Sequence, residues 1–212
     1  MPTTTQQSVL DAAAAIVLGD GFDALSLRRL ARHLDRPLAD IDAHFPALES
    51  LVARLLTREA ERLARVIGDH IDRDPLGGLP SRIFRYSLVA VYEQPVARAL
   101  YLDAPSSLAR MVHLVDGLAE LPVLSVHADF LPALQRAGMM RDDVDPRTIA
   151  ALLDAVGAGV AVAATRQQID DVAAGLATLL ERAADADVED TTPGKLLFAQ
   201  YAAIVAAESP RG

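Results

Sequence analysis

Four arginines stand within nine residues near the N-terminus, and their spacing could bind a polyanion. They are Arg28, Arg29, Arg32 and Arg36. A guanidinium presents a fork of N–H donors that matches two phosphate oxygens, so arginines on one helix face are candidate phosphate contacts. The alternative is an ordinary solvated helix face.

The residues after the arginines could meet the edges of bases. They are Asp40, Asp42, Ala43 and His44. A carboxylate such as that of Asp42 can accept a hydrogen bond from a cytosine amino group in the major groove. However, this stretch has two acids and no lysine or arginine, whereas most affinity for DNA comes from cations that neutralise phosphates. A solvated Asp42 and a packing or capping His44 are the alternatives.

Two short helices and a tight turn must position these side chains. Ser26 can accept hydrogen bonds from the free N–H groups of a first helical turn. Apolar residues then recur at helical spacing, at Leu27, Leu30, Ala31 and Leu34. Asp35 tolerates the left-handed conformation that a tight turn demands, and Pro37 ends one helix and suits the start of the next, over 38–44. The pattern predicts a helix-turn-helix, whose second helix would enter the major groove.

At these residues the sequence resembles the N-terminal domain of the TetR (tetracycline-repressor-like) family of bacterial transcription regulators. The resemblance covers about the first 55 residues and rests on Gly21, Phe22, Ser26, Leu27, Leu30, Ala31, Arg32, Ile41, His44, Phe45, Pro46, Glu49 and Leu51. The chain departs from the pattern at Asp35, Arg36 and Pro37, where the family has Gly-Val-Ser, at Leu38 for Lys and at Asp42 for Tyr. The resemblance implies a homodimer that binds double-stranded operator DNA through Ser26, the four arginines, Asp40, Asp42, Ala43 and His44.

Apolar periodicity predicts helices in the rest of the chain. Thr4 and Gln7 have capping-box spacing for a first helix that ends near Gly19, and a long helix is expected over 46–72. A loop over 72–80 precedes seven further helices, expected over 81–93, 96–102, 106–121, 123–137, 146–166, 169–184 and 193–208. We therefore predict an all-α fold: an N-terminal three-helix helix-turn-helix domain, 1–50, followed by a C-terminal helical ligand-binding and dimerisation domain, 51–212.

Small and apolar side chains in the last helices could form a dimer interface. The run over 156–164 is made of Gly, Ala and Val, which permits close approach of another helix, and the last helix is apolar. The alternative is a tightly packed core within one chain. A symmetric dimer is what a palindromic operator requires.

Larger polar and aromatic side chains on the middle helices could bind a small-molecule effector, which members of the family commonly enclose there. They are Phe84, Tyr92, Arg98, Tyr101, Met111, His113, His127 and Phe130. A cavity with a few convergent polar groups is the usual form of such a site. Each of these residues has an ordinary core or surface position as its alternative, because spacing alone does not show convergence.

Charge and composition exclude several classes of function. The chain has a net charge of −9, and residues 1–51 contain four arginines and seven carboxylates. It has no cysteine, no apolar run of membrane-spanning length and no signal peptide, which predicts a cytoplasmic protein without contact to a membrane. The five histidines lack metal-binding spacing, and phosphate-binding loops and nucleophile motifs are absent. We therefore expect no enzyme activity, no metal and no cofactor.

Two functions remain after these exclusions. The first is a TetR-like transcription regulator, a repressor released from its operator by a small molecule. The alternative is a protein of the same fold that has lost ordinary DNA binding and acts as a ligand-sensing or protein-interaction module. The acidity of the predicted recognition helix is the feature that keeps both open.

Overall fold

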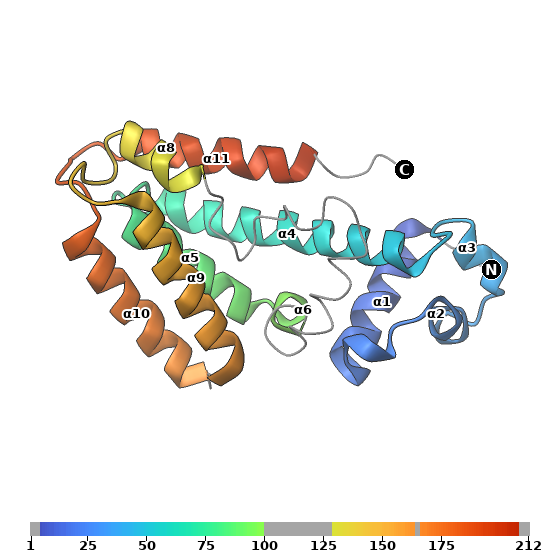
Figure 1. Ribbon diagram of the computed structural model, residues 1–212. Helices are drawn as coiled ribbons and strands as arrows, with labels where there is room; N and C mark the ends of the chain where they lie inside the picture. The colour runs from blue at the N-terminus through green and yellow to red at the C-terminus, as the bar shows by residue number, and fades with distance from the viewer. Residues whose placement is uncertain (1–4, 100–128, 164–165, 208–212) are drawn as a thin grey trace. The chain divides into compact units, whose positions relative to one another are not determined.

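The computed structural model describes residues 5–99, 129–163 and 166–207, and within these ranges the chain is built of helices (Figure 1). The N-terminal elements are α1 (Gln6–Asp20), the short 3₁₀ helix η1 (Phe22–Ala24), α2 (Leu27–His33), α3 (Leu38–Asp42), α4 (Leu48–Arg73), α5 (Pro80–Glu93) and α6 (Pro95–Arg98). The C-terminal elements are α8 (Phe130–Arg136), α9 (Pro146–Ala163), α10 (Arg166–Ala183) and α11 (Thr192–Ala207). The described residues include no strand, only an isolated antiparallel bridge between Met140 and Asp185. The all-α prediction is confirmed.

Most predicted helices lie within a few residues of the observed ones. The long helix begins at Leu48 instead of Pro46, and α3 ends at Asp42, so Ala43 and His44 follow it in a turn. The helix predicted over 106–121 and most of that over 123–137 lie outside the described residues. None of the helices in the described part of the chain is long and apolar enough to span a bilayer.

Two compact units can be distinguished along the chain. Unit 1 comprises residues 1–59, 95–120 and 209–212, and unit 2 comprises residues 60–94 and 121–208. α4 therefore contributes its first residues to unit 1 and the remainder to unit 2. The boundary predicted between residues 50 and 51 stays a prediction.

In unit 1, α1 packs against η1 and α2, and α2 packs against α3. The capping box of α1 consists of Thr5 and Ser8: the Thr5 hydroxyl accepts from the Ser8 amide, and the Ser8 hydroxyl accepts from the Thr5 amide. It lies one residue later than the predicted box of Thr4 and Gln7. The core of the unit is formed by side chains that are almost completely buried, among them Val9, Leu10, Ile16, Leu30, Ile41, Phe45, Leu51 and Leu55. Helices as short as α2 and α3 are not stable alone, so the packing of this core holds them in place.

The turn between α2 and α3 is a Schellman motif built on an aspartate. The Arg36 amide donates to the Ala31 carbonyl at 2.9 Å, and the Asp35 amide donates to the Arg32 carbonyl at 3.3 Å. Asp35 has φ = 51°, the left-handed conformation that glycine usually supplies at this point of the motif. The prediction of a left-handed Asp35 is confirmed.

Replacing Asp35 with glycine is expected to stabilise the protein by about 0.5–1 kcal/mol. Relief of the left-handed Cβ strain exceeds the extra entropy that glycine has in the unfolded chain. Urea denaturation measures the change. Asp35→Asn is the matched control, since it removes the charge and keeps a Cβ, and it should give a smaller gain. An Asp35→Gly variant no more stable than the parent would contradict this account of the turn.

A buried ion-pair cluster joins α4 to α1 within unit 1. The Arg58 guanidinium donates to the Asp11 carboxylate at 2.8 Å, to the Leu10 carbonyl at 3.2 Å and to the Glu59 carboxylate at 3.2 Å. Glu59 is only 1% exposed and Arg58 only 8%. A buried carboxylate without a partner is costly, so Arg58 is a structural residue and not a candidate phosphate contact.

In unit 2, α5 packs against α10, and a residue after α10 caps α5. The Ser81 amide donates to one Asp185 carboxylate oxygen at 3.0 Å, and the Ser81 hydroxyl donates to the other at 2.5 Å. The carboxylate thereby satisfies a free donor in the first turn of α5, where Leu79 at the N-cap supplies no side-chain acceptor. Burial raises the pKa of Asp185, although both hydrogen bonds from Ser81 favour the ionised form.

The α4–α5 loop of unit 2 is fastened to the start of α11 by close backbone contact. The Thr191 hydroxyl donates to the Pro75 carbonyl at 2.7 Å, and the Lys195 ammonium donates to the Asp74 carbonyl at 2.7 Å. A Cβ on Gly78 would lie 2.0 Å from the Thr191 carbonyl oxygen, and one on Gly194 would lie 2.0 Å from the Gly78 carbonyl oxygen. Both positions therefore require glycine for steric reasons.

Asp74 organises the same loop through its side chain. It accepts hydrogen bonds from the Tyr86 hydroxyl at 2.7 Å and from the Leu76 amide at 2.9 Å. Burial alone would raise the pKa of Asp74. These hydrogen bonds and the charges of Arg82 and Lys195 outweigh burial, so the pKa lies below its ordinary value.

Candidate functional site

The predicted DNA-binding residues begin at a capped helix N-terminus. Ser26 is extended, with φ = −157°, and its hydroxyl accepts from the Arg29 amide at 3.3 Å. The predicted cap is therefore confirmed. It fixes the start of α2 and with it the direction in which the following arginines leave the helix.

Of the four arginines, α2 brings Arg28 and Arg32 together on one exposed face. They are four residues apart, and both side chains are exposed. Arg29 is half-buried and forms an ion pair with Asp20 at 2.6 Å, which offsets its charge. Arg36 is half-buried in the turn before α3. Among the four arginines, Arg28 and Arg32 are thus the exposed pair that a phosphate backbone could reach.

The candidate base-reading residues divide between two faces of α3 and the turn that follows. Asp40 and His44 are half-buried on the side of the fully buried Ile41, whereas Asp42 and Ala43 are exposed. Of the two acidic candidates, Asp40 and Asp42, only Asp42 is therefore exposed.

The outward face of α3 contains two residues that the sequence-based prediction missed. Leu38 is 36% exposed, and Ala39 is also exposed. The helical period gives part of the signal, because Leu38 and Ala39 precede the exposed Asp42 and Ala43 by four residues each. The exposure of Leu38, three residues before the buried Ile41, is visible only in the structure.

The predicted effector-binding residues are spread over several elements. Phe84 and Tyr92 lie half-buried on α5, and Phe130 on α8 packs its ring against Tyr201 of α11 at 5.3 Å between centroids. Arg98 is exposed on α6, which belongs to unit 1. The remaining four, Tyr101, Met111, His113 and His127, lie outside the described residues.

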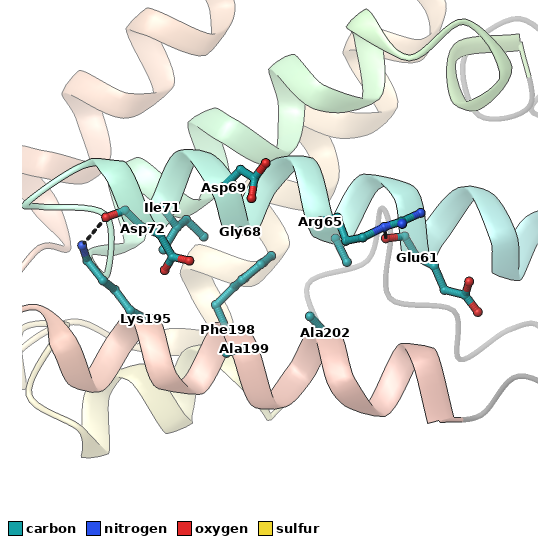
Figure 2. Close-up of a pocket in the computed structure, with 11 residues that line it drawn as sticks. Glu61, Arg65, Gly68, Asp69, Ile71, Asp72, Lys195, Phe198, Ala199 and Ala202 are labelled. Carbon is teal, nitrogen blue, oxygen red and sulfur yellow. Dashed lines mark hydrogen bonds between the residues drawn. The ribbon is translucent and has the colours of Figure 1, made fainter.

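A groove of about 460 Å³ lies in unit 2 along α4 and α11 (Figure 2). Its described lining residues are Glu61, Ala64, Arg65, Gly68, Asp69, Ile71, Asp72, Lys195, Phe198, Ala199 and Ala202. Phe198 lies over Gly68, where an added Cβ would meet the phenyl ring at 3.7 Å, so the floor is apolar. The Lys195 ammonium at one end is bound to main-chain oxygens of Asp72 and Asp74, at 3.3 and 2.7 Å. None of the predicted effector-binding residues is among these lining residues.

In the described part of the chain, no group of three or more histidine and acidic side chains could hold a metal ion.

Comparison with solved structures relates this arrangement to one family of regulators. A protein from Rhodococcus sp., described as a TetR-family transcriptional regulator, superposes with a TM-score of 0.58, 16% identity and coverage of 84% of this chain and 96% of its own. CprB, a TetR-family protein from S. coelicolor A3(2), gives 0.51, 18% identity and 96% of both chains. This chain has a TetR-like fold.

A third structural neighbour was solved with a small molecule. The multidrug binding protein EbrR, complexed with imidazole, gives a TM-score of 0.51 at 23% identity, with 82% of this chain and 96% of the other covered. No family model and no curated protein matches the sequence. At these identities the likeness establishes the TetR-like fold alone, and the function must be argued from the residues.

Proposed function

We propose that this TetR-like protein is a cytoplasmic transcription regulator that binds operator DNA as a homodimer and is released by a small molecule. The observation that carries the proposal is the exposed pair Arg28 and Arg32 on α2, which shares a helix-turn-helix with α3. In such a motif the first helix crosses the phosphate backbone and the second enters the major groove. The two arginines lie on the helix that would meet phosphates.

Exposed apolar side chains in unit 2 support a dimer. Leu152 on α9, Leu179 on α10, and Leu196 and Ile204 on α11 are each more than half exposed. Within the small-residue run of α9, Ala158 and Gly159 are exposed. Association of two copies through these helices would remove apolar surface from water and give the two-fold symmetry that a palindromic operator matches.

The effector is proposed to bind unit 2. The groove along α4 and α11 has the volume of a small-molecule site. Phe84, Tyr92 and Phe130 do not line this groove, and they stay candidate contacts for an effector elsewhere in unit 2. In the proposed mechanism, effector binding favours a conformation in which the two helix-turn-helix motifs of the dimer no longer match the spacing of the half-sites.

A second function is favoured by the charges of unit 1. Asp20 offsets Arg29, and Asp23, Asp35 and Asp42 are exposed. Acidic groups at this surface repel phosphates. If they dominate over Arg28 and Arg32, the protein keeps the TetR-like fold and acts as a ligand-sensing or protein-interaction module without operator binding.

Titration of labelled DNA at several salt concentrations distinguishes the two functions. The probe is the intergenic duplex upstream of the protein's own gene, beside a random duplex of equal length. Operator binding predicts sequence preference and a steep loss of affinity with salt. Arg28→Ala/Arg32→Ala should weaken binding at least about tenfold and lower the salt slope by about 1.8 for each protomer engaged.

The matched control is Arg85→Ala/Arg182→Ala, which removes the same charge from exposed positions of unit 2. It should leave affinity and salt slope close to those of the parent. Absence of binding to either duplex at low salt would refute operator binding and favour the interaction module.

A further inference from the structure

The outward face of α3 has a composition that limits which bases it can recognise. At 100° per residue, Leu38, Ala39, Asp42 and the C-cap Ala43 fall within one arc of about 140°, with Leu38 at its edge, about 60° from Ile41. In the structure, Ile41 is completely buried and the four outward residues are exposed.

The four outward side chains offer three apolar groups, one anionic acceptor and no hydrogen-bond donor. In the major groove the thymine C5 methyl group is the apolar feature of the base edges, and it is contacted by apolar side chains. Cytosine presents an amino donor, which a carboxylate accepts. Guanine presents two acceptors, N7 and O6, which need a donor and repel a carboxylate.

We propose that the outward face of α3 reads a pyrimidine tract in the operator half-site. Leu38, Ala39 and Ala43 contact thymine methyl groups, and Asp42 accepts a hydrogen bond from a cytosine amino group. The inference rests on the proposed operator binding and adds the class of sequence that is bound. Arg28 and Arg32 supply affinity through phosphates, while the α3 face supplies the preference among bases.

The first test selects bound duplexes from a randomised library with the full-length protein at low salt. The expected half-site is rich in thymine and cytosine on the strand that faces α3. The selected thymines are then replaced one at a time by deoxyuridine, which deletes the methyl group and leaves base pairing intact. Each contacted methyl group should cost about fourfold in affinity, the equivalent of one buried methylene.

Substitutions in α3 link the preference to named residues. Leu38→Ala should remove the penalty for deoxyuridine at one position of the half-site. Asp42→Asn should move the preference at another position from cytosine to adenine, because a carboxamide matches adenine N6 and N7. Arg28→Ala is the control, and it should weaken all duplexes about equally without changing the selected sequence.

The outcomes separate this inference from the function on which it rests. If no duplex is selected, operator binding fails and the inference fails with it. Selected duplexes that are insensitive to deoxyuridine, or a preference that Asp42→Asn leaves unchanged, would overturn the pyrimidine reading while operator binding stands. Loss of sensitivity in Leu38→Ala together with the altered preference of Asp42→Asn would establish it.

Discussion

Replacement of Gly194 with alanine is expected to lower the free energy of unfolding by about 3 kcal/mol or more. The added Cβ would lie 2.0 Å from the Gly78 carbonyl oxygen, well inside the 3.0 Å limit of real Cβ contacts. The neighbour is backbone and cannot rotate away, so the α4–α5 loop or the start of α11 must move. Such movement would strain the hydrogen bond from the Thr191 hydroxyl to the Pro75 carbonyl.

Helix propensity predicts the opposite sign for the same substitution. Alanine in a helix is favoured over glycine by about 1 kcal/mol, and Gly194 lies within α11. Gly19→Ala in α1 is therefore the control, because nothing lies within 4 Å of its added Cβ. Thermal and urea unfolding followed by circular dichroism should show a stabilised Gly19→Ala and a strongly destabilised Gly194→Ala. A Gly194→Ala variant as stable as the parent would show that the loop and α11 are not in this contact.

The parts of the fold that could be predicted from sequence depend on local chemistry. The Ser26 cap and the left-handed Asp35 each involve residues no more than a few positions apart, and the buried Ile41 and Phe45 stand four positions apart, at the helical spacing of apolar residues. The capping box was predicted one residue early because Thr4 and Thr5 offer the same hydroxyl, and the choice depends on Ser8 reaching back to Thr5.

Contacts between residues that are far apart in the sequence could not be predicted from such local patterns. The cap of α5 is a carboxylate 104 residues further along the chain, since Ser81 is bound by Asp185. Gly78 lies in the predicted loop over 72–80 and Gly194 in the predicted helix over 193–208, and neither segment alone shows that their backbones approach closely. The role of such residues can be predicted only when their tertiary partner is known.

The candidate site shows the same division. Spacing predicted that Arg28 and Arg32 share a face, but it could not show that Arg29 is paired with Asp20. The exposure of Leu38 does not follow from the helical period, because Leu38 stands three residues before the buried Ile41 and therefore next to the buried side of α3. The effector-binding residues require convergence of several helices, which spacing does not encode, and they stay predictions.

Replacement of Arg58 with methionine is expected to destabilise unit 1 by about 3–5 kcal/mol, the cost of breaking a buried ion pair from one side. Methionine keeps the unbranched apolar stem, so lost packing contributes little. The main effect comes from Glu59, which is 1% exposed and loses the guanidinium bound to its carboxylate at 3.2 Å. The ion pair with Asp11 contributes less, because that carboxylate is 61% exposed and can be solvated.

A double variant tests this assignment. Arg58→Met/Glu59→Gln removes the buried charge together with its partner and should recover most of the stability that Arg58→Met loses, as measured by urea denaturation. Arg65→Met on the same helix is the matched control, since Arg65 is exposed, and it should change stability by no more than about 0.5 kcal/mol. If Arg58→Met proves as mild as Arg65→Met, or the double variant is no more stable than the single one, the cluster is not the support of α4 on α1. If the double variant recovers, the cost belongs to the charge of the buried Glu59 carboxylate, which loses the Arg58 guanidinium, and the arginine serves unit 1 by offsetting a carboxylate that its core has already buried.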